Sequence, residues 1–157
     1  MAAPAAPPAC EVWFYHLERT SLDRALPELL EKTLAKGWRA VVRARDRDRI
    51  EHLDGWLWSF RDEAFLPHGL AEEDHAARQP VLLTTGFETP NRAQALFLID
   101  DADPGGLEGF ERCIFLFDGQ DEAAVAAARA RWKALKARGA PISYWKQNAR
   151  GGWEKAA

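Results

Sequence analysis

The sequence has few of the residues that build disulfide frameworks and metal centres. Its 157 residues include only two cysteines, Cys10 and Cys113, and four histidines. The cysteines match neither a disulfide framework nor a zinc pattern, and no two histidines have the i, i+4 spacing of a helical metal site. We therefore expect no metal and no cofactor. We also expect Cys113 to be a small buried hydrophobe, in a protein of the reduced cytoplasm.

Long apolar runs are also missing. No stretch approaches the roughly 18 apolar residues that a membrane span needs, so we expect no membrane contact. The start, "MAAPAAPPAC", lacks the basic and leucine-rich regions of a secretory signal, and residues 1–10 are predicted to be a disordered lead. A hydrophobic content of 47% and a charged content of 29% are typical of a globular chain. We expect a single domain over residues 11–145 and a basic, flexible tail over residues 146–157.

Motifs for phosphate binding and nucleophilic catalysis are absent. The segment "ALFLIDDAD" (95–103) is similar to a Walker B strand, with Asp100 and Asp101 at its end. However, the chain has no G-x-x-x-x-G-K-[ST] loop and no G-x-G-x-x-G after its first strand, so nothing would hold the phosphates. The two aspartates are interpreted as turn formers. Since G-x-S-x-G is missing too, the sequence does not predict an enzyme.

Short apolar runs alternate with helical patterns. Strands are predicted over residues 11–17, 38–44, 81–85, 95–100 and 112–119. Helices are predicted over residues 21–37, from Asp46 or Asp48 to Leu57, and over residues 121–139. Residues 59–80 are expected to form a long loop, and residues 103–110 a turn with one short helical turn. Because the strands are continuously apolar, we predict a three-layer α/β fold with a mostly parallel sheet and helices on both faces.

Charge is divided unevenly along the chain. Residues 129–157 carry a net charge of +7, whereas the first 128 residues carry −10. Such asymmetry indicates an anionic partner for the basic end.

The helix over residues 121–139 carries most of this positive charge. At 100° per residue, Trp132 lies at the seam between a buried face and solvent. The buried face is expected to comprise Ala124, Ala128 and Leu135. The seam is flanked by Val125, Arg129, Lys133 and Lys136. An apolar slot beside cations suits a ligand with a hydrophobic group next to a carboxylate, although a solvated helix with a half-buried tryptophan fits the pattern as well.

Seven tryptophans are many for this length. Trp13, Trp38 and Trp56 are placed for core packing. Trp58 instead lies at a helix end, next to a loop with Phe65 and other apolar residues. This loop either forms a partner site or folds back over the sheet.

Several segments together resemble the chi subunit of bacterial DNA polymerase III. They are "EVWFYHL", "LLEKTLAKGWRAVVRA", "LDGWLWSFRDEAFLPHGL", "QPVLLTT", "ALFLID" and "ARARWKALKARG". The resemblance covers about residues 11–145 in matching order, and "LWSFRDEAFLPHGL" is its most specific part.

The resemblance implies a Rossmann-like accessory subunit without catalysis. It implies binding to the acidic C-terminal tail of single-stranded-DNA-binding protein, which ends in Pro-Phe, through Arg129, Trp132 and Lys133. It also implies contact with the psi subunit, and through it the clamp loader, on a surface with Trp58, Phe65, Pro67 and His68. DNA would be reached indirectly, at replication forks in the nucleoid.

Two alternatives remain open from the residues alone. The same cations and exposed tryptophans would serve direct binding of single-stranded nucleic acid, although the acidic remainder of the chain opposes it. A degenerate nucleotide-dependent enzyme would need a phosphate cradle that the sequence lacks.

Overall fold

The computed structural model describes residues 10–59, 67–107, 109–150 and 152–156. An eight-stranded sheet in the order β3-β4-β2-β5-β6-β1-β7-β8 forms its centre, and all strand pairs are parallel except β7 with β8. The strands are β1 (Glu11–Leu17), β2 (Ala40–Arg43), β3 (His68–Leu70), β4 (Val81–Thr84), β5 (Ala95–Ile99), β6 (Arg112–Asp118), β7 (Ile142–Gln147) and β8 (Trp153–Lys155). The helices are α1 (Leu22–Ala35), α2 (Arg47–Ser59), the short 3-10 helix η1 (Ala76–Arg78) and α3 (Glu122–Ala137).

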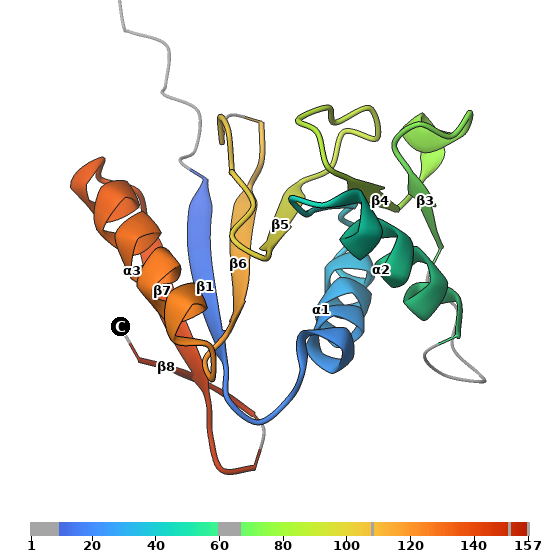
Figure 1. The fold of residues 1–157 in the computed structure, drawn as a ribbon. Helices are drawn as coiled ribbons and strands as arrows, with labels where there is room; N and C mark the ends of the chain where they lie inside the picture. Colours follow the sequence, from blue (N-terminus) through green and yellow to red (C-terminus); the bar gives the residue numbers. More distant parts are fainter. Residues whose placement is uncertain (1–9, 60–66, 108, 151, 157) are drawn as a thin grey trace, which may run out of the picture.

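The helices form two layers, as Figure 1 shows: α1 and α2 cover one face of the sheet and α3 covers the other. β4 and β5 are buried along their whole length because both faces of the sheet are covered there. Side chains of β1 alternate between the layers, so that Tyr15 packs with α1 and Phe14 packs with α3. The predicted three-layer α/β fold with a mostly parallel sheet is confirmed.

The helix α1 contains a proline well inside its interior. The helix begins at Leu22, so Pro27 lies beyond its first turn. A proline cannot donate a hydrogen bond to the carbonyl four residues earlier, which is that of Asp23. The indole N–H of Trp56 in α2 donates to this carbonyl instead. The contact ties α1 to α2 and explains why the proline is tolerated.

Three expectations of local structure are wrong. Residues 59–80 are not one loop, because they contain β3 and η1. The described residues of 103–110 contain no helix. Residues 146–157 are not a flexible tail throughout, since β7 continues to Gln147 and β8 pairs with it over residues 153–155. β3 and β8 are short, and their pairing with β4 and β7 decides their structure.

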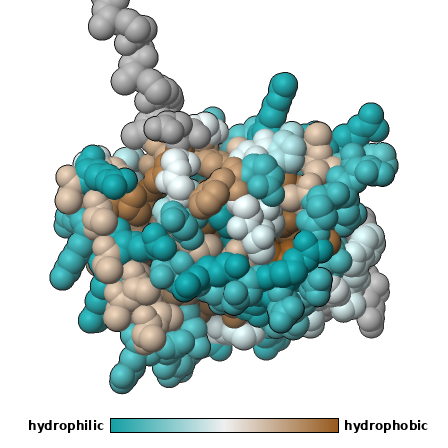
Figure 2. Space-filling view, turned by 45° about the horizontal axis from the view of Figure 1, so that its top comes forward, coloured by the Kyte–Doolittle hydropathy of each residue, from teal (hydrophilic) through white to brown (hydrophobic). Residues whose placement is uncertain are grey.

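The side of the molecule seen in Figure 2 has a mainly hydrophilic surface. Figure 2 brings forward the side of the molecule at the top of Figure 1, where apolar residues reach the surface in the middle of the view and hydrophilic side chains surround them.

Cys113 is fully buried and Cys10 is partly buried. Burial raises the pKa of Cys10 to about 11 and that of Cys113 well above its usual range, so both thiols stay protonated at neutral pH. Within the described ranges, no helix is long and apolar enough to span a membrane.

Candidate functional site

The helix α3 is fixed at both ends. Its first turn is capped by Asp121, whose carboxylate accepts hydrogen bonds from the backbone N–H groups of Ala123 and Ala124 at 3.0 and 3.3 Å. After its last turn Gly139 adopts a φ of +79°, which favours glycine. Ala128 and Leu135 are buried against the sheet, as expected, and Ala124 is half-buried. The helix therefore presents a fixed face to solvent.

Trp132 lies at the border of that face. Its ring contacts two aromatic rings of the sheet edge-on, Phe14 of β1 at 5.5 Å and Tyr144 of β7 at 5.7 Å between centroids. It remains partly exposed, and so does Val125 two turns earlier. The predicted seam position is therefore confirmed. The two ring contacts hold the indole in one orientation and leave part of it open to a ligand.

Three cations lie beside Trp132 on α3. Arg129, Lys133 and Lys136 are all exposed. In the part of the chain that the structure describes, none of them forms an ion pair. Lys136 lies over the Trp132 ring, with its Nζ 5.9 Å from the centroid. By contrast, Arg131 on the same helix donates to Asp101 at 2.6 Å, so it belongs to the scaffold.

The strand β7 forms a second wall that the sequence did not predict. Tyr144 and Lys146 lie on the face of β7 that α3 covers, next to His16 of β1, which pairs in register with Lys146. Alternation of Ile142, Tyr144 and Lys146 with residues facing the other layer is the signal that would have revealed this strand. We use the name α3–β7 groove for the surface on which the ring contact of Trp132 with Tyr144 joins α3 to β7. Arg129, Trp132 and Lys133 border it on α3, and Tyr144 and Lys146 border it on β7.

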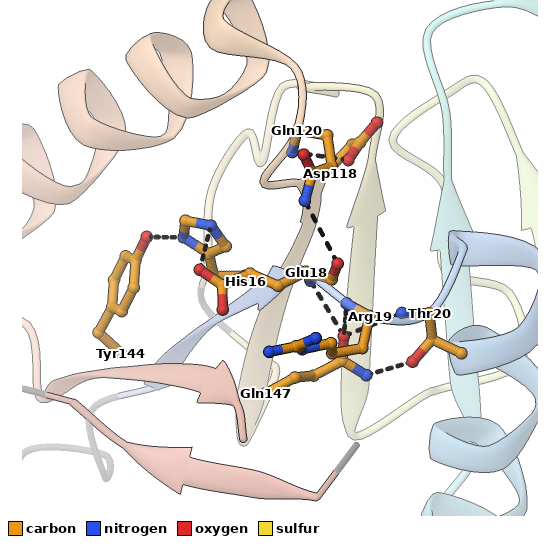
Figure 3. A network of polar contacts seen from close by, with 8 residues as sticks. All are labelled: His16, Glu18, Arg19, Thr20, Asp118, Gln120, Tyr144 and Gln147. Carbon is orange, nitrogen blue, oxygen red and sulfur yellow. Dashed lines mark hydrogen bonds and ion pairs between the residues drawn. The ribbon is translucent and has the colours of Figure 1, made fainter. Parts of the chain in front are cut away.

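Tyr144 forms a hydrogen-bonded pair with His16 of β1. The Nδ1 of His16 is 2.6 Å from the hydroxyl of Tyr144, and its Nε2 is 3.4 Å from Glu18 (Figure 3). Burial lowers the pKa of His16, with Glu18 opposing the change and Lys146 and Arg129 adding to it. Burial raises the pKa of Tyr144, so its hydroxyl keeps its proton at neutral pH.

The first strand-to-helix turn is occupied by a side chain of the protein itself. In nucleotide-binding α/β folds this turn offers its backbone N–H groups to phosphate. Here the N–H groups of Glu18, Arg19 and Thr20 all donate to the side-chain oxygen of Gln147, at 3.0, 2.8 and 3.1 Å (Figure 3). The amide nitrogen of Gln147 in turn donates to the hydroxyl of Thr20. The donors that a phosphate would need are thus already bonded.

The two aspartates after β5 are also accounted for. Asp100 and Asp101 adopt φ values of +51° and +55°, as residues of a tight turn do. Asp100 pairs with Arg49 of α2 at 3.0 Å, and Asp101 pairs with Arg131 of α3. They border a pocket of about 600 Å³ at the carboxyl ends of β1, β5 and β6. Within the described residues, no cluster of three metal-ligating side chains exists.

The second predicted surface lies at the end of α2. Trp58 is 55% exposed and its ring centroid is 5.0 Å from that of His68 in β3. Pro67 is exposed, whereas Phe65 lies outside the described residues. His68 is itself buried, and its Nε2 donates to the backbone carbonyl of Asp54 at 3.1 Å. The buried His68 ring therefore packs against the indole of Trp58.

Comparison with known proteins gives concordant matches. The protein family described as "DNA polymerase III chi subunit, HolC" matches residues 10–143. A Pseudomonas aeruginosa protein named "DNA polymerase III subunit chi" is 36% identical over 114 residues, which are 73% of this chain and 78% of that protein. A Rickettsia prowazekii protein named "Probable DNA polymerase III subunit chi" is 29% identical over 89 residues, 57% of this chain and 54% of that protein.

Proposed function

This chain belongs to the DNA polymerase III chi subunit family, and from that premise we propose that its α3–β7 groove binds the acidic C-terminal tail of single-stranded-DNA-binding protein. The chain is a non-catalytic accessory subunit of the polymerase. As a replication subunit it would act in the cytoplasm, at replication forks.

One observation carries the proposal: a partly exposed indole, fixed by two rings, lies next to three cations that form no ion pair with any residue the structure describes. Cations that serve only solubility are commonly mixed with acidic residues on a helix face. On α3 the first-turn residue Glu122 is the one acidic residue of the helix, and it lies two turns from Arg129. Unpaired positive charge beside an apolar slot suits an acidic peptide that ends in an aromatic residue.

The terminal phenylalanine of the tail would pack against Trp132. Its α-carboxylate would pair with Arg129, whose planar fork of N–H donors fits a carboxylate. Lys133 and Lys136 would attract the aspartates that precede it. Because such a short peptide buries little surface, the affinity should be modest, roughly micromolar, and sensitive to salt.

The test is fluorescence anisotropy with a labelled acidic peptide that ends in Pro-Phe. The protein should bind this peptide but not a peptide that lacks the phenylalanine. Arg129→Ala and Trp132→Ala should abolish binding while circular dichroism reports an intact fold, and Trp58→Ala is the matched control. A labelled oligothymidine tests the alternative of direct single-stranded nucleic-acid binding. Binding of the oligonucleotide with neither peptide bound would overturn the proposal.

We further propose that the surface of Trp58 and Pro67, supported by His68, contacts the psi subunit and so links the chain to the clamp loader. Trp58 is 55% exposed, and tryptophan is enriched at protein–protein interfaces relative to the rest of the surface. Co-purification with psi should fail for Trp58→Ala and persist for Trp132→Ala. Equal retention of psi by both variants would contradict the assignment.

A further inference from the structure

His16 and Tyr144 are buried or half-buried polar groups that the proposed peptide contacts do not yet use. Their rings lie 5.9 Å apart, and His16 also packs against Phe117 of β6 at 5.1 Å. The side chain of His16 is 10% exposed, so its surroundings are protein rather than water. A histidine here titrates under the influence of whatever occupies the groove above it.

We propose that His16 and Tyr144 form a proton-dependent hydrogen-bond donor in the α3–β7 groove, which strengthens binding of the acidic peptide as the pH falls. This inference rests on the proposed function, because it assigns a regulation to the same site.

The chemistry follows from the two nitrogens of the imidazole. In the neutral tautomer whose Nδ1 accepts, the hydroxyl of Tyr144 donates its proton to His16 across the 2.6 Å contact. When His16 is protonated, both nitrogens donate. Nδ1–H then donates to the oxygen of Tyr144, and Nε2–H faces Glu18 at 3.4 Å. The hydroxyl proton of Tyr144 is released from His16 and becomes available to a carboxylate in the groove.

Charges from every neighbouring element act on His16. Glu18, in the turn after β1, and Asp118, at the end of β6, favour the imidazolium. Arg129 of α3 and Lys146 of β7 oppose it, and burial opposes it most of all. The free protein therefore holds His16 neutral at pH 7. A bound tail would bring its α-carboxylate to Arg129, and so would neutralise one of the two opposing cations and add negative charge near the imidazole.

The direction of the pH effect follows by linkage. Because burial lowers the pKa of His16 in the free protein and the bound carboxylate raises it, the complex binds more protons than the free protein does. Affinity should therefore rise as the pH falls from about 8 through the higher pKa of the complex, and level off below the pKa of the free protein. Linkage to one proton limits the effect to about tenfold per pH unit, so we expect about a threefold to tenfold gain between pH 8 and pH 6. Carboxylates of the peptide titrate near pH 4 and contribute little in this range.

The experiment repeats the anisotropy titration at several pH values between 6 and 8. The wild-type affinity should rise as stated, and His16→Gln should bind with one affinity throughout, equal to the wild-type value at pH 8. Tyr144→Phe keeps the ring contact with Trp132 but loses the hydroxyl, so it should also lose the gain at low pH. His52→Gln is the matched control, because His52 is exposed on α2 and pairs with Asp23.

A second measurement separates this inference from the proposed function. The imidazole of His16 is titrated by NMR with and without the peptide, and its pKa should be higher in the complex. Phe-dependent binding with an unchanged pKa for His16 and no pH dependence would overturn this inference and leave the proposed function standing. Failure of the wild-type protein to bind the peptide at any pH would overturn both.

Discussion

The two helical layers of the molecule differ in how the cations on their surfaces are paired. On α2, Arg47 pairs with Glu51 and Glu72, Arg49 pairs with Asp23 and Asp100, and His52 pairs with Asp23. On α3, Arg129, Lys133 and Lys136 form no ion pair with the described residues, and Lys136 instead lies over the Trp132 ring. The opposite charges of an ion pair largely cancel each other's electric field. Charges of one sign that form no ion pair produce a field that attracts a partner of the opposite charge. This difference is why we propose α3 as the binding layer, although both helices pack on the same sheet.

The largest difference between the two layers should appear when one charge in each layer is reversed. Arg129→Glu should weaken binding of the acidic peptide by about 30-fold or more, about 2 kcal/mol, because it replaces an attraction to the α-carboxylate with repulsion. Arg47→Glu on α2 should leave peptide affinity unchanged. Both are measured by anisotropy at low salt, and equal losses in the two variants would refute the division between the layers.

Salt should affect the two layers unequally. Raising the salt concentration from about 50 mM to about 500 mM shortens the Debye length from about 14 Å to about 4 Å, so peptide affinity should fall about fivefold to tenfold. Thermal unfolding of the free protein should change little, because its exposed ion pairs contribute little to stability. An affinity independent of salt would mean that the cations of α3 do not contact the peptide.

Substitution of a cation by a neutral residue should lower the stability of the protein more on α2 than on α3. Arg49→Gln removes two ion pairs that join α2 to α1 and to the end of β5, and it should lower the free energy of unfolding by about 0.5–1 kcal/mol, because the pairs are partly exposed. Lys133→Gln should change it by less than about 0.3 kcal/mol, within the usual range for surface substitutions. Urea denaturation measures both, and a larger loss for Lys133→Gln would indicate a structural role for that lysine.

A small effect is expected from Asp101→Asn, which alters the ion pair of Arg131 on α3. The substitution weakens the contact with Arg131 but keeps the turn, since asparagine accepts a positive φ as aspartate does. We expect a loss of about 0.5 kcal/mol in stability and less than a twofold change in peptide affinity, because Arg131 points away from the α3–β7 groove. A marked gain in affinity would mean that the whole of α3, rather than one face, attracts the peptide.

The sequence predicts the parts of this fold that are long and regular. The five apolar strands and the three α-helices lie where the sequence predicts them. Their hydrophobic periodicity depends on neighbouring residues only, so it can be recognised without knowledge of the tertiary structure. The seam position of Trp132 followed from the same periodicity, since the geometry of a helix fixes which side chains share a face.

The missed parts depend on partners distant in the sequence. β3 and β8 have three residues each and exist because β4 and β7 provide a ladder for them. The contact between His16 and Tyr144 joins residues 128 positions apart, and the sequence indicates neither the pairing nor its distance. For this reason the α3 side of the groove was foreseen and the β7 side was not. The roles of Arg129, Trp132 and Trp58 in binding stay predictions.

The contact of Gln147 with the turn before α1 has a thermodynamic consequence. A protein that closes this turn around a nucleotide gains stability whenever the nucleotide is abundant and loses it when the nucleotide is scarce. Gln147 is instead an internal ligand, whose effective concentration is fixed by the covalent chain and does not vary with the metabolic state of the cell. The folded population of this subunit, and with it the shape of the groove beside β7, should therefore be the same in starved and growing cells.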